Sequence, residues 1–137
     1  MGTRLTAGHV LHPGRARAEV LRLTAPLSFW GGTDPAGRIT DPHHPQRGAR
    51  LAGRVVVVRA SRGSSSSSSV LAEHIRRGHG PAALLLAERD AIVALGALAA
   101  AELYGLDVPV LCLDAADFAA VPAEGIVSVG EDGTVTW

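Results

Sequence analysis

The sequence predicts an α/β fold, and three features of the chain support this prediction. In the second half, short apolar runs alternate with longer segments of helical periodicity, the pattern of right-handed strand-helix-strand units with parallel strands. The first half has strand patterns among many glycines and prolines, so we expect it to close a second β layer against the first. A chain of 137 residues that is 47% hydrophobic can build one core but not two of ordinary size, which predicts a single domain over residues 1–137.

The first half contains two predicted strands and a long connection between them. Residues 16–23 (ARAEVLRL) alternate polar and apolar side chains, as a half-buried strand does, and residues 54–58 (RVVVV) form the unbroken apolar run of a buried strand. The connection, residues 27–48, is rich in Gly, Pro and Asp. Its Asp34 and Asp41 are expected in turns and caps rather than as catalytic acids. A connection of this length inside a compact domain is usually functional.

The second half begins with a helix that is predicted to start within a run of six serines and to end at Gly78. Val70, Leu71 and Ile75 form its apolar face. Strands and helices then alternate, and the last two strands pair through an Asp-Gly turn. The remaining elements are a strand at 82–87, a helix at 90–104 closed by Gly105, a strand at 108–113, a short helix at 114–120, and strands at 125–129 and 134–137.

Composition limits the classes of function. The chain has 13 basic and 13 acidic residues and only 4% aromatic residues, which argues against a nucleic-acid partner. No run approaches the roughly 18 apolar residues of a membrane helix, and the first ten residues lack the apolar core of a signal peptide, so a cytoplasmic protein is expected. The single cysteine, Cys112, lies in an apolar run and is expected in the core. The six histidines lack the spacing of a metal site, so no metal is expected to be bound by this chain alone.

The serine loop, residues 59–69 (RASRGSSSSSS), joins a buried strand to a helix. Such a junction points the free N–H groups of the helix start at whatever lies above the carboxyl end of the strand. One serine is expected to cap the helix. Gly63 permits a tight turn and a close approach of the backbone to a ligand, and Arg62 offers a fork for a carboxylate or phosphate. The sequence of the loop therefore predicts an anion-binding turn that presents a hydroxyl, rather than a flexible linker.

Three segments together carry a family resemblance: LSFWGGTDPAGRITDPHHP, GRVVVVRASRGSSSSSSVL and DAIVALGALAAAELYG. The chain resembles the small subunit, or swivelling domain, of the aconitase X family from about Gly14 to Phe118. The resemblance implies a swivelling β/β/α domain like the mobile fourth domain of aconitases. It also implies a heterodimer or higher complex with a large aconitase X subunit, which is expected to hold an iron-sulfur cluster or iron. Members of the family are hydro-lyases that dehydrate small hydroxy acids, either mevalonate 5-phosphate or cis-3-hydroxy-L-proline.

The resemblance also assigns roles to residues. It places the catalytic base on Ser64, the first serine after Gly63, and a second recurrent serine on Ser68, as a structural or substrate contact. Many relatives have a glycine where this chain has Ser67, which leaves Ser65 as a contender for the base or for substrate binding. Arg62 and Gly63 are expected to bind substrate.

The aromatic pair Phe29 and Trp30 has three possible roles: substrate contact, core packing or subunit interface. For the chain as a whole, two hypotheses of different classes follow. In the first, it is one half of a dehydratase that is active only with its large subunit. In the second, it is a non-catalytic module that binds a small anion at the serine loop. Among substrates, cis-3-hydroxy-L-proline is favoured over mevalonate 5-phosphate, because the chain has no lysine and its serine loop offers only Arg59 and Arg62 to a phosphate.

Overall fold

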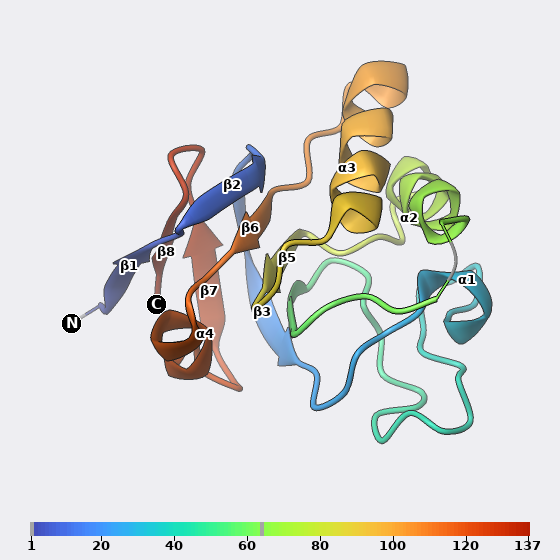
Figure 1. Cartoon of the computed structure of the whole chain (residues 1–137), viewed down its shortest axis with the longest axis horizontal. Helices are drawn as coiled ribbons and strands as arrows, with labels where there is room; N and C mark the ends of the chain where they lie inside the picture. The colour runs from blue at the N-terminus through green and yellow to red at the C-terminus, as the bar shows by residue number, and fades with distance from the viewer. Residues whose placement is uncertain (1, 64) are drawn as a thin grey trace.

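The computed structural model describes residues 2–63 and 65–137. Within these residues the strands form one eight-stranded sheet in the order β1-β8-β7-β3-β4-β5-β6-β2 (Figure 1). The strands are β1 Arg4–Thr6, β2 His9–His12, β3 Ala16–Arg22, β4 Val55–Val58, β5 Ala83–Leu86, β6 Val110–Cys112, β7 Ile126–Val129 and β8 Thr134–Thr136. The helices are α1 Phe29–Gly32, α2 Ser67–Arg76, α3 Ala91–Tyr104 and α4 Ala115–Ala120.

Strand β3 joins two parts of the sheet that differ in direction. On one side it runs parallel to β4, which is followed by the parallel strands β5 and β6. On the other side it pairs antiparallel with β7, which continues antiparallel to β8 and then β1. The predicted parallel α/β unit is confirmed. The β-rich first half contributes β3 and β4 to this unit, while the second β part is built from both ends of the chain.

The four valines of β4 show how the two faces of the sheet are buried. Val56 and Val58 belong to a core cluster with α2 and α3, whereas Val55 and Val57 belong to a second cluster with β7 and β8. The strand is therefore covered by helices on one face and by β structure on the other, which is the β/β/α order of layers. Burial on both faces explains why its sequence is apolar throughout instead of alternating.

Helices α2 and α3 pack side by side on one face of the sheet (Figure 1). Gly96 is the point of close approach, because a Cβ at this position would lie 2.9 Å from the Ser68 carbonyl oxygen and 3.0 Å from Leu71. α3 therefore packs against α2 through this side. The opposite side of α3 exposes Leu95 and Leu98. Its ends agree with the prediction, since the Asp90 side chain caps the start and Gly105 ends the helix at φ 66°.

Three elements were not predicted: β1, β2 and α1. β1 and β2 are the two end strands of the sheet and have only three or four residues. Strands this short contain too few residues to show an apolar periodicity. The connection over residues 27–48 is ordered by tertiary contacts rather than by local pattern. It is held to the rest of the chain by isolated bridges, such as the one between Leu27 and Ser61, and by the buried side chains of Phe29 and Ile39.

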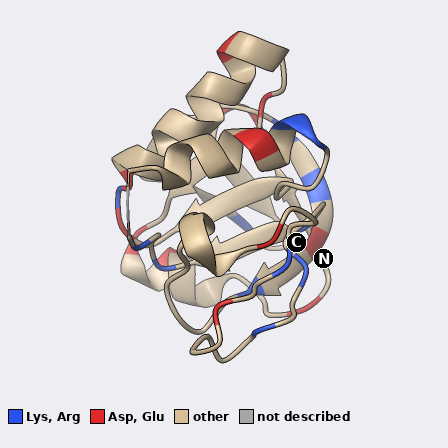
Figure 2. Ribbon diagram, turned by 90° about the vertical axis from the view of Figure 1, so that its right-hand side faces the viewer, with Lys and Arg blue, Asp and Glu red and all other residues tan. Residues whose placement is uncertain are grey.

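Charged residues are interspersed around the ribbon, with basic and acidic segments side by side in the view of Figure 2. Among the described residues no helix has the length and apolar character needed to cross a membrane.

Candidate functional site

The serine loop leaves the carboxyl end of β4 and turns sharply at Gly63. The glycine has φ 100°, a region that side-chain-bearing residues rarely adopt, and a Cβ there would lie 2.9 Å from the Ser28 Oγ atom. The predicted tight turn at Gly63 is therefore confirmed. The backbone N–H of Arg62 donates to the Leu27 carbonyl (3.0 Å), so the loop runs beside residues 27 and 28.

Asp90 fixes the start of the serine loop from outside it. Its Oδ2 atom accepts hydrogen bonds from both the backbone N–H (2.9 Å) and the hydroxyl of Ser61. Its Oδ1 atom accepts from the backbone N–H groups of Ile92 (3.0 Å) and Val93 (3.1 Å), at the start of α3. One carboxylate thus caps a helix and ties the serine loop to that helix. An Asp at the start of an apolar helix is a common cap, but the sequence contains no signal for the bond to Ser61.

Residues 28–33, called here the tryptophan turn, form the second half of the site. The turn contains α1, whose backbone departs from helical geometry at Trp30 (φ −85°, ψ 117°) and Gly31 (φ 80°). Phe29 is only 1% exposed and packs in the core with the helices, whereas Trp30 is 58% exposed. Of the three roles considered for this pair, core packing describes Phe29, and Trp30 is left facing outward for a substrate or a partner.

The serines that follow Gly63 differ in their surroundings. Ser64 lies outside the described residues. Ser65 is exposed, and its carbonyl accepts a hydrogen bond from the Ser68 hydroxyl (2.8 Å). Ser66 takes the N-cap position of α2 with helical backbone angles (φ −61°, ψ −18°), and within the described residues the predicted hydroxyl cap is not formed there, because a capping residue needs an extended backbone. Ser67 is buried, and its hydroxyl accepts a hydrogen bond from the Trp30 backbone N–H (3.2 Å).

Two arginines of the serine loop have different partners. Arg59 forms a surface ion pair with Glu88 at 2.9 Å. Arg62 is exposed, and within the described residues no hydrogen bond or ion pair occupies its guanidinium. Arg62 is therefore the cation of this loop that is available to an anionic ligand.

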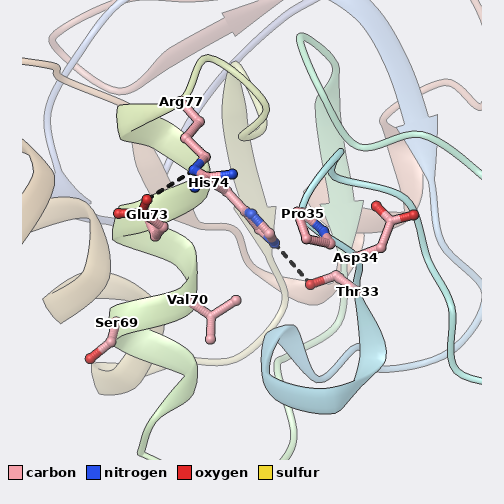
Figure 3. A pocket seen from close by; sticks show the side chains of 8 residues that line it. All are labelled: Thr33, Asp34, Pro35, Ser69, Val70, Glu73, His74 and Arg77. Atoms are coloured by element: carbon pink, nitrogen blue, oxygen red, sulfur yellow. Dashed lines mark hydrogen bonds and ion pairs between the residues drawn. The ribbon is translucent and has the colours of Figure 1, made fainter.

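A groove of about 390 Å³ lies between α2 and the segment that follows the tryptophan turn (Figure 3). His74 stands at its base, where its Nε2 atom lies 2.9 Å from the Thr33 hydroxyl oxygen. Burial is the largest cause that lowers the pKa of His74 from its ordinary value of 6.5. The side chains that line the groove are Thr33, Asp34, Pro35, Ser69, Val70, Glu73, His74 and Arg77.

The groove has a charged outer edge. Glu73 forms ion pairs with Arg76 and Arg77, whose hydrogen bonds lower the pKa of the Glu73 carboxyl to about 2. Asp34 and Asp41 accept hydrogen bonds from backbone N–H groups two residues further on, which confirms their prediction as turn residues.

No group of three or more His, Cys, Asp or Glu side chains among residues 2–63 and 65–137 could hold a metal ion. Cys112 is buried in β6, as predicted, and burial raises the pKa of its thiol. The described residues therefore do not fit an iron-sulfur cluster or an iron ion.

Comparison with known proteins identifies the family. The sequence profile described as the aconitase X swivel domain matches residues 5–137. The chain belongs to this family of swivel domains. A crystal structure titled as holo-form aconitase X from Thermococcus kodakaraensis has the same fold, with a TM-score of 0.83 and 30% sequence identity over 97% of this swivel domain and 96% of the matched chain.

Two relatives of this swivel domain carry different names. A cis-3-hydroxy-L-proline dehydratase from Pseudomonas aeruginosa is 46% identical over 80% of this chain, which corresponds to 19% of the relative. A phosphomevalonate dehydratase small subunit from Methanothermobacter thermautotrophicus is 37% identical over 66% of this chain and 70% of the relative. The swivel domain thus spans about a fifth of the length of the first relative. Both relatives are named dehydratases.

Apart from Ser64, the predicted site residues come together in the swivel domain. Arg62, Gly63, Ser65 and Ser68 lie in the serine loop, and Phe29 and Trp30 lie in the tryptophan turn that contacts it. The sequence prediction missed the residues that hold these two segments in place, namely Ser28, Ser61, Ser67, His74 and Thr33. Asp90 was also missed, although an Asp directly before an apolar helix was a signal for it. The others form bonds between distant segments that no local pattern announces.

Proposed function

We propose that this swivel domain is the small subunit of a heteromeric hydro-lyase that dehydrates a small hydroxy acid, with Ser64 as the catalytic base. The observation that carries the proposal is the junction of two predicted site segments, because the tryptophan turn lies directly against the serine loop at Gly63 and at Ser67. The family match and the names of the relatives support the type of reaction.

The surroundings of the serine loop suit a base at Ser64. A serine hydroxyl removes a proton well only when the charge on its oxygen is stabilised. The loop leads into α2, a helix of ten residues, and the positive end of its dipole favours negative charge at the loop. Arg62, exposed beside Gly63, could hold the carboxylate of the substrate. Trp30 could form an apolar wall beside it.

A large subunit is proposed to complete the site. Elimination of water needs a group that takes up the leaving hydroxyl, and the described residues of this chain do not form a site for iron that could do so. In this proposal the partner holds the iron-sulfur cluster or iron, and the swivel domain supplies the base and part of the carboxylate site. The small-subunit name of the Methanothermobacter relative and the roughly fourfold greater length of the Pseudomonas relative support such an arrangement.

For the substrate, we favour cis-3-hydroxy-L-proline. Of the two arginines in the serine loop, Arg59 is already paired with Glu88, which leaves Arg62 for one anionic group. A zwitterionic ring acid needs one such clamp, whereas a phosphorylated acid needs more positive charge. The relative with this activity in its name also shares 46% of aligned residues with this chain. The alternative is mevalonate 5-phosphate, with the additional charge supplied by the large subunit.

The test is activity of the complex reconstituted with its large subunit. The Ser64→Ala variant is expected to lose most turnover of cis-3-hydroxy-L-proline while still binding its partner, and Ser128→Ala, at a half-buried serine of β7 outside the serine loop, serves as the matched control. Iron is expected in the complex and not in the purified chain alone. Full turnover by Ser64→Ala would refute the base, and Ser65→Ala would then be tested. Dehydration of mevalonate 5-phosphate without turnover of the hydroxyproline would refute the substrate preference.

A further inference from the structure

Helix α2 has two polar side chains on a face that is otherwise apolar. Ser67 and His74 are 2% and 4% exposed, and they lie among buried residues of the same helix such as Leu71 and Ile75. They are seven positions apart, so two helical turns bring them to the same side of the helix. Both side chains are hydrogen-bonded to one segment, the tryptophan turn.

The hydrogen bond of His74 has a defined direction. The Thr33 hydroxyl donates its single hydrogen to the Phe29 carbonyl (2.8 Å), so it is left to accept from the His74 Nε2–H group (2.9 Å). In the neutral ring that carries its hydrogen on Nε2, the other nitrogen, Nδ1, is an acceptor. Among residues 2–63 and 65–137, Nδ1 is buried and has no hydrogen-bond partner. The lowered pKa of His74 agrees with a neutral ring.

An imidazole is a costly choice for this position if packing is its only role. Burying an unpartnered nitrogen loses the free energy of its hydration, and an aliphatic side chain on the apolar face of α2 would avoid that loss. What an aliphatic side chain cannot provide is the bond to Thr33. The directional bond is thus the property that distinguishes His74 from a core residue.

The tryptophan turn needs such external bonds. Its backbone departs from helical geometry at Trp30 and Gly31, so the internal hydrogen bonds of a regular helix do not fix its shape. Ser67 holds its start through the Trp30 N–H, and His74 holds its end through Thr33. Ser28 also donates to the Trp30 carbonyl (2.6 Å) and lies against Gly63 of the serine loop. The position of the turn relative to the loop is therefore set by these two side-chain bonds to α2 together with the burial of Phe29 and the backbone bonds between Leu27 and the serine loop.

We infer that His74 is a positioning residue of the site: through Thr33 it fixes the tryptophan turn on α2 and so sets where Trp30 stands beside the serine loop. This inference rests on the proposed function for its effect on catalysis, but its structural part can be measured without any enzyme activity.

The structural test uses the fluorescence of Trp30 in the full chain. The chain has two tryptophans, so a Trp137→Phe background leaves Trp30 as the only reporter. His74→Leu is expected to shift the emission of Trp30 and its accessibility to a neutral quencher. His74→Gln, whose amide nitrogen can still donate to Thr33, is expected to keep the parental emission. His43→Leu, at an exposed histidine, is the matched control and is expected to change nothing.

The catalytic test uses the same variants in the reconstituted complex. His74→Leu is expected to lower kcat/KM roughly tenfold or more through misplacement of Trp30. The kcat/KM of His74→Gln is expected to stay within roughly twofold of the parent value, a difference no larger than independent substitutions usually produce. If His74→Leu does not fold, Thr33→Val removes the same bond with little change in side-chain volume and replaces it in both tests.

The outcomes separate this inference from the proposed function. The positioning role would be overturned if a folded His74→Leu chain kept the parental Trp30 emission and kcat/KM. It would also be overturned if His74→Gln showed the same emission shift and the same fall in kcat/KM as His74→Leu. Active Ser64→Ala complex together with the expected His74 pattern would remove the base assignment and leave the positioning role standing.

Discussion

Replacement of Asp90 by alanine should destabilise the protein much more than loss of an ordinary helix cap. The Asp90 carboxylate accepts hydrogen bonds from the backbone N–H groups of Ile92 and Val93, and from both the N–H and the hydroxyl of Ser61. Asp114 offers a matched control, since among the described residues its side chain caps α4 through a single bond to the Asp117 N–H (2.8 Å) and bonds to no other segment. Both aspartates precede their helix with an extended backbone.

The expected magnitude follows from these bonds. Loss of the cap alone costs about 1 kcal/mol of the free energy of unfolding, and this is the effect expected for Asp114→Ala. Asp90→Ala also leaves the part-buried N–H of Ser61 without its acceptor, and a hydrogen bond to a charged group contributes about 1.5–3 kcal/mol. A total of roughly 2–4 kcal/mol is therefore expected for Asp90→Ala.

The assay is equilibrium unfolding in urea, followed by circular dichroism. With a slope in the middle of the range for small proteins, about 2 kcal/mol per molar urea, Asp90→Ala should lower the midpoint by roughly 1–2 M and Asp114→Ala by about 0.5 M. Equal shifts for the two variants would refute the reasoning, because they would mean that the bonds to Ser61 contribute nothing beyond the helix cap.

Two further predictions concern stability. Gly96→Val should destabilise the chain by roughly 1–3 kcal/mol, because its Cβ would meet the Ser68 carbonyl oxygen at 2.9 Å. Thermal unfolding measures this effect, with Ala91→Val, at an exposed site on the same helix, as the control. An unchanged midpoint for Gly96→Val would contradict the close contact. The free energy of unfolding should decrease as the pH is lowered below about 6.5. Burial lowers the pKa of His74 in the folded chain, so the unfolded chain binds a proton that the folded chain does not. Urea unfolding between about pH 7 and about pH 5 should show a smaller loss for His74→Gln than for the parent, and equal losses would exclude His74 as the cause.

Local signals in the sequence were sufficient for most regular elements. The unbroken valine run of β4 and the Gly105 stop of α3 each depend on neighbours along the chain, and each lies where it was expected. The tight turn at Gly63 also followed from residue type, since glycine tolerates its positive φ. The residues of the serine loop indicated an anion-binding turn, and the family resemblance then predicted the catalytic base at Ser64.

Only the tertiary structure decided how these segments form a site. Phe29 and Trp30 are adjacent and equally apolar in sequence, yet one is 1% and the other 58% exposed, because the irregular backbone of the tryptophan turn directs them to opposite sides. The bond between His74 and Thr33 spans 41 positions and the bond between Ser61 and Asp90 spans 29. Helical and strand periodicity arises from neighbours a few residues apart, whereas bonds of this span exist only after the sheet and helices have packed and brought their partners within reach.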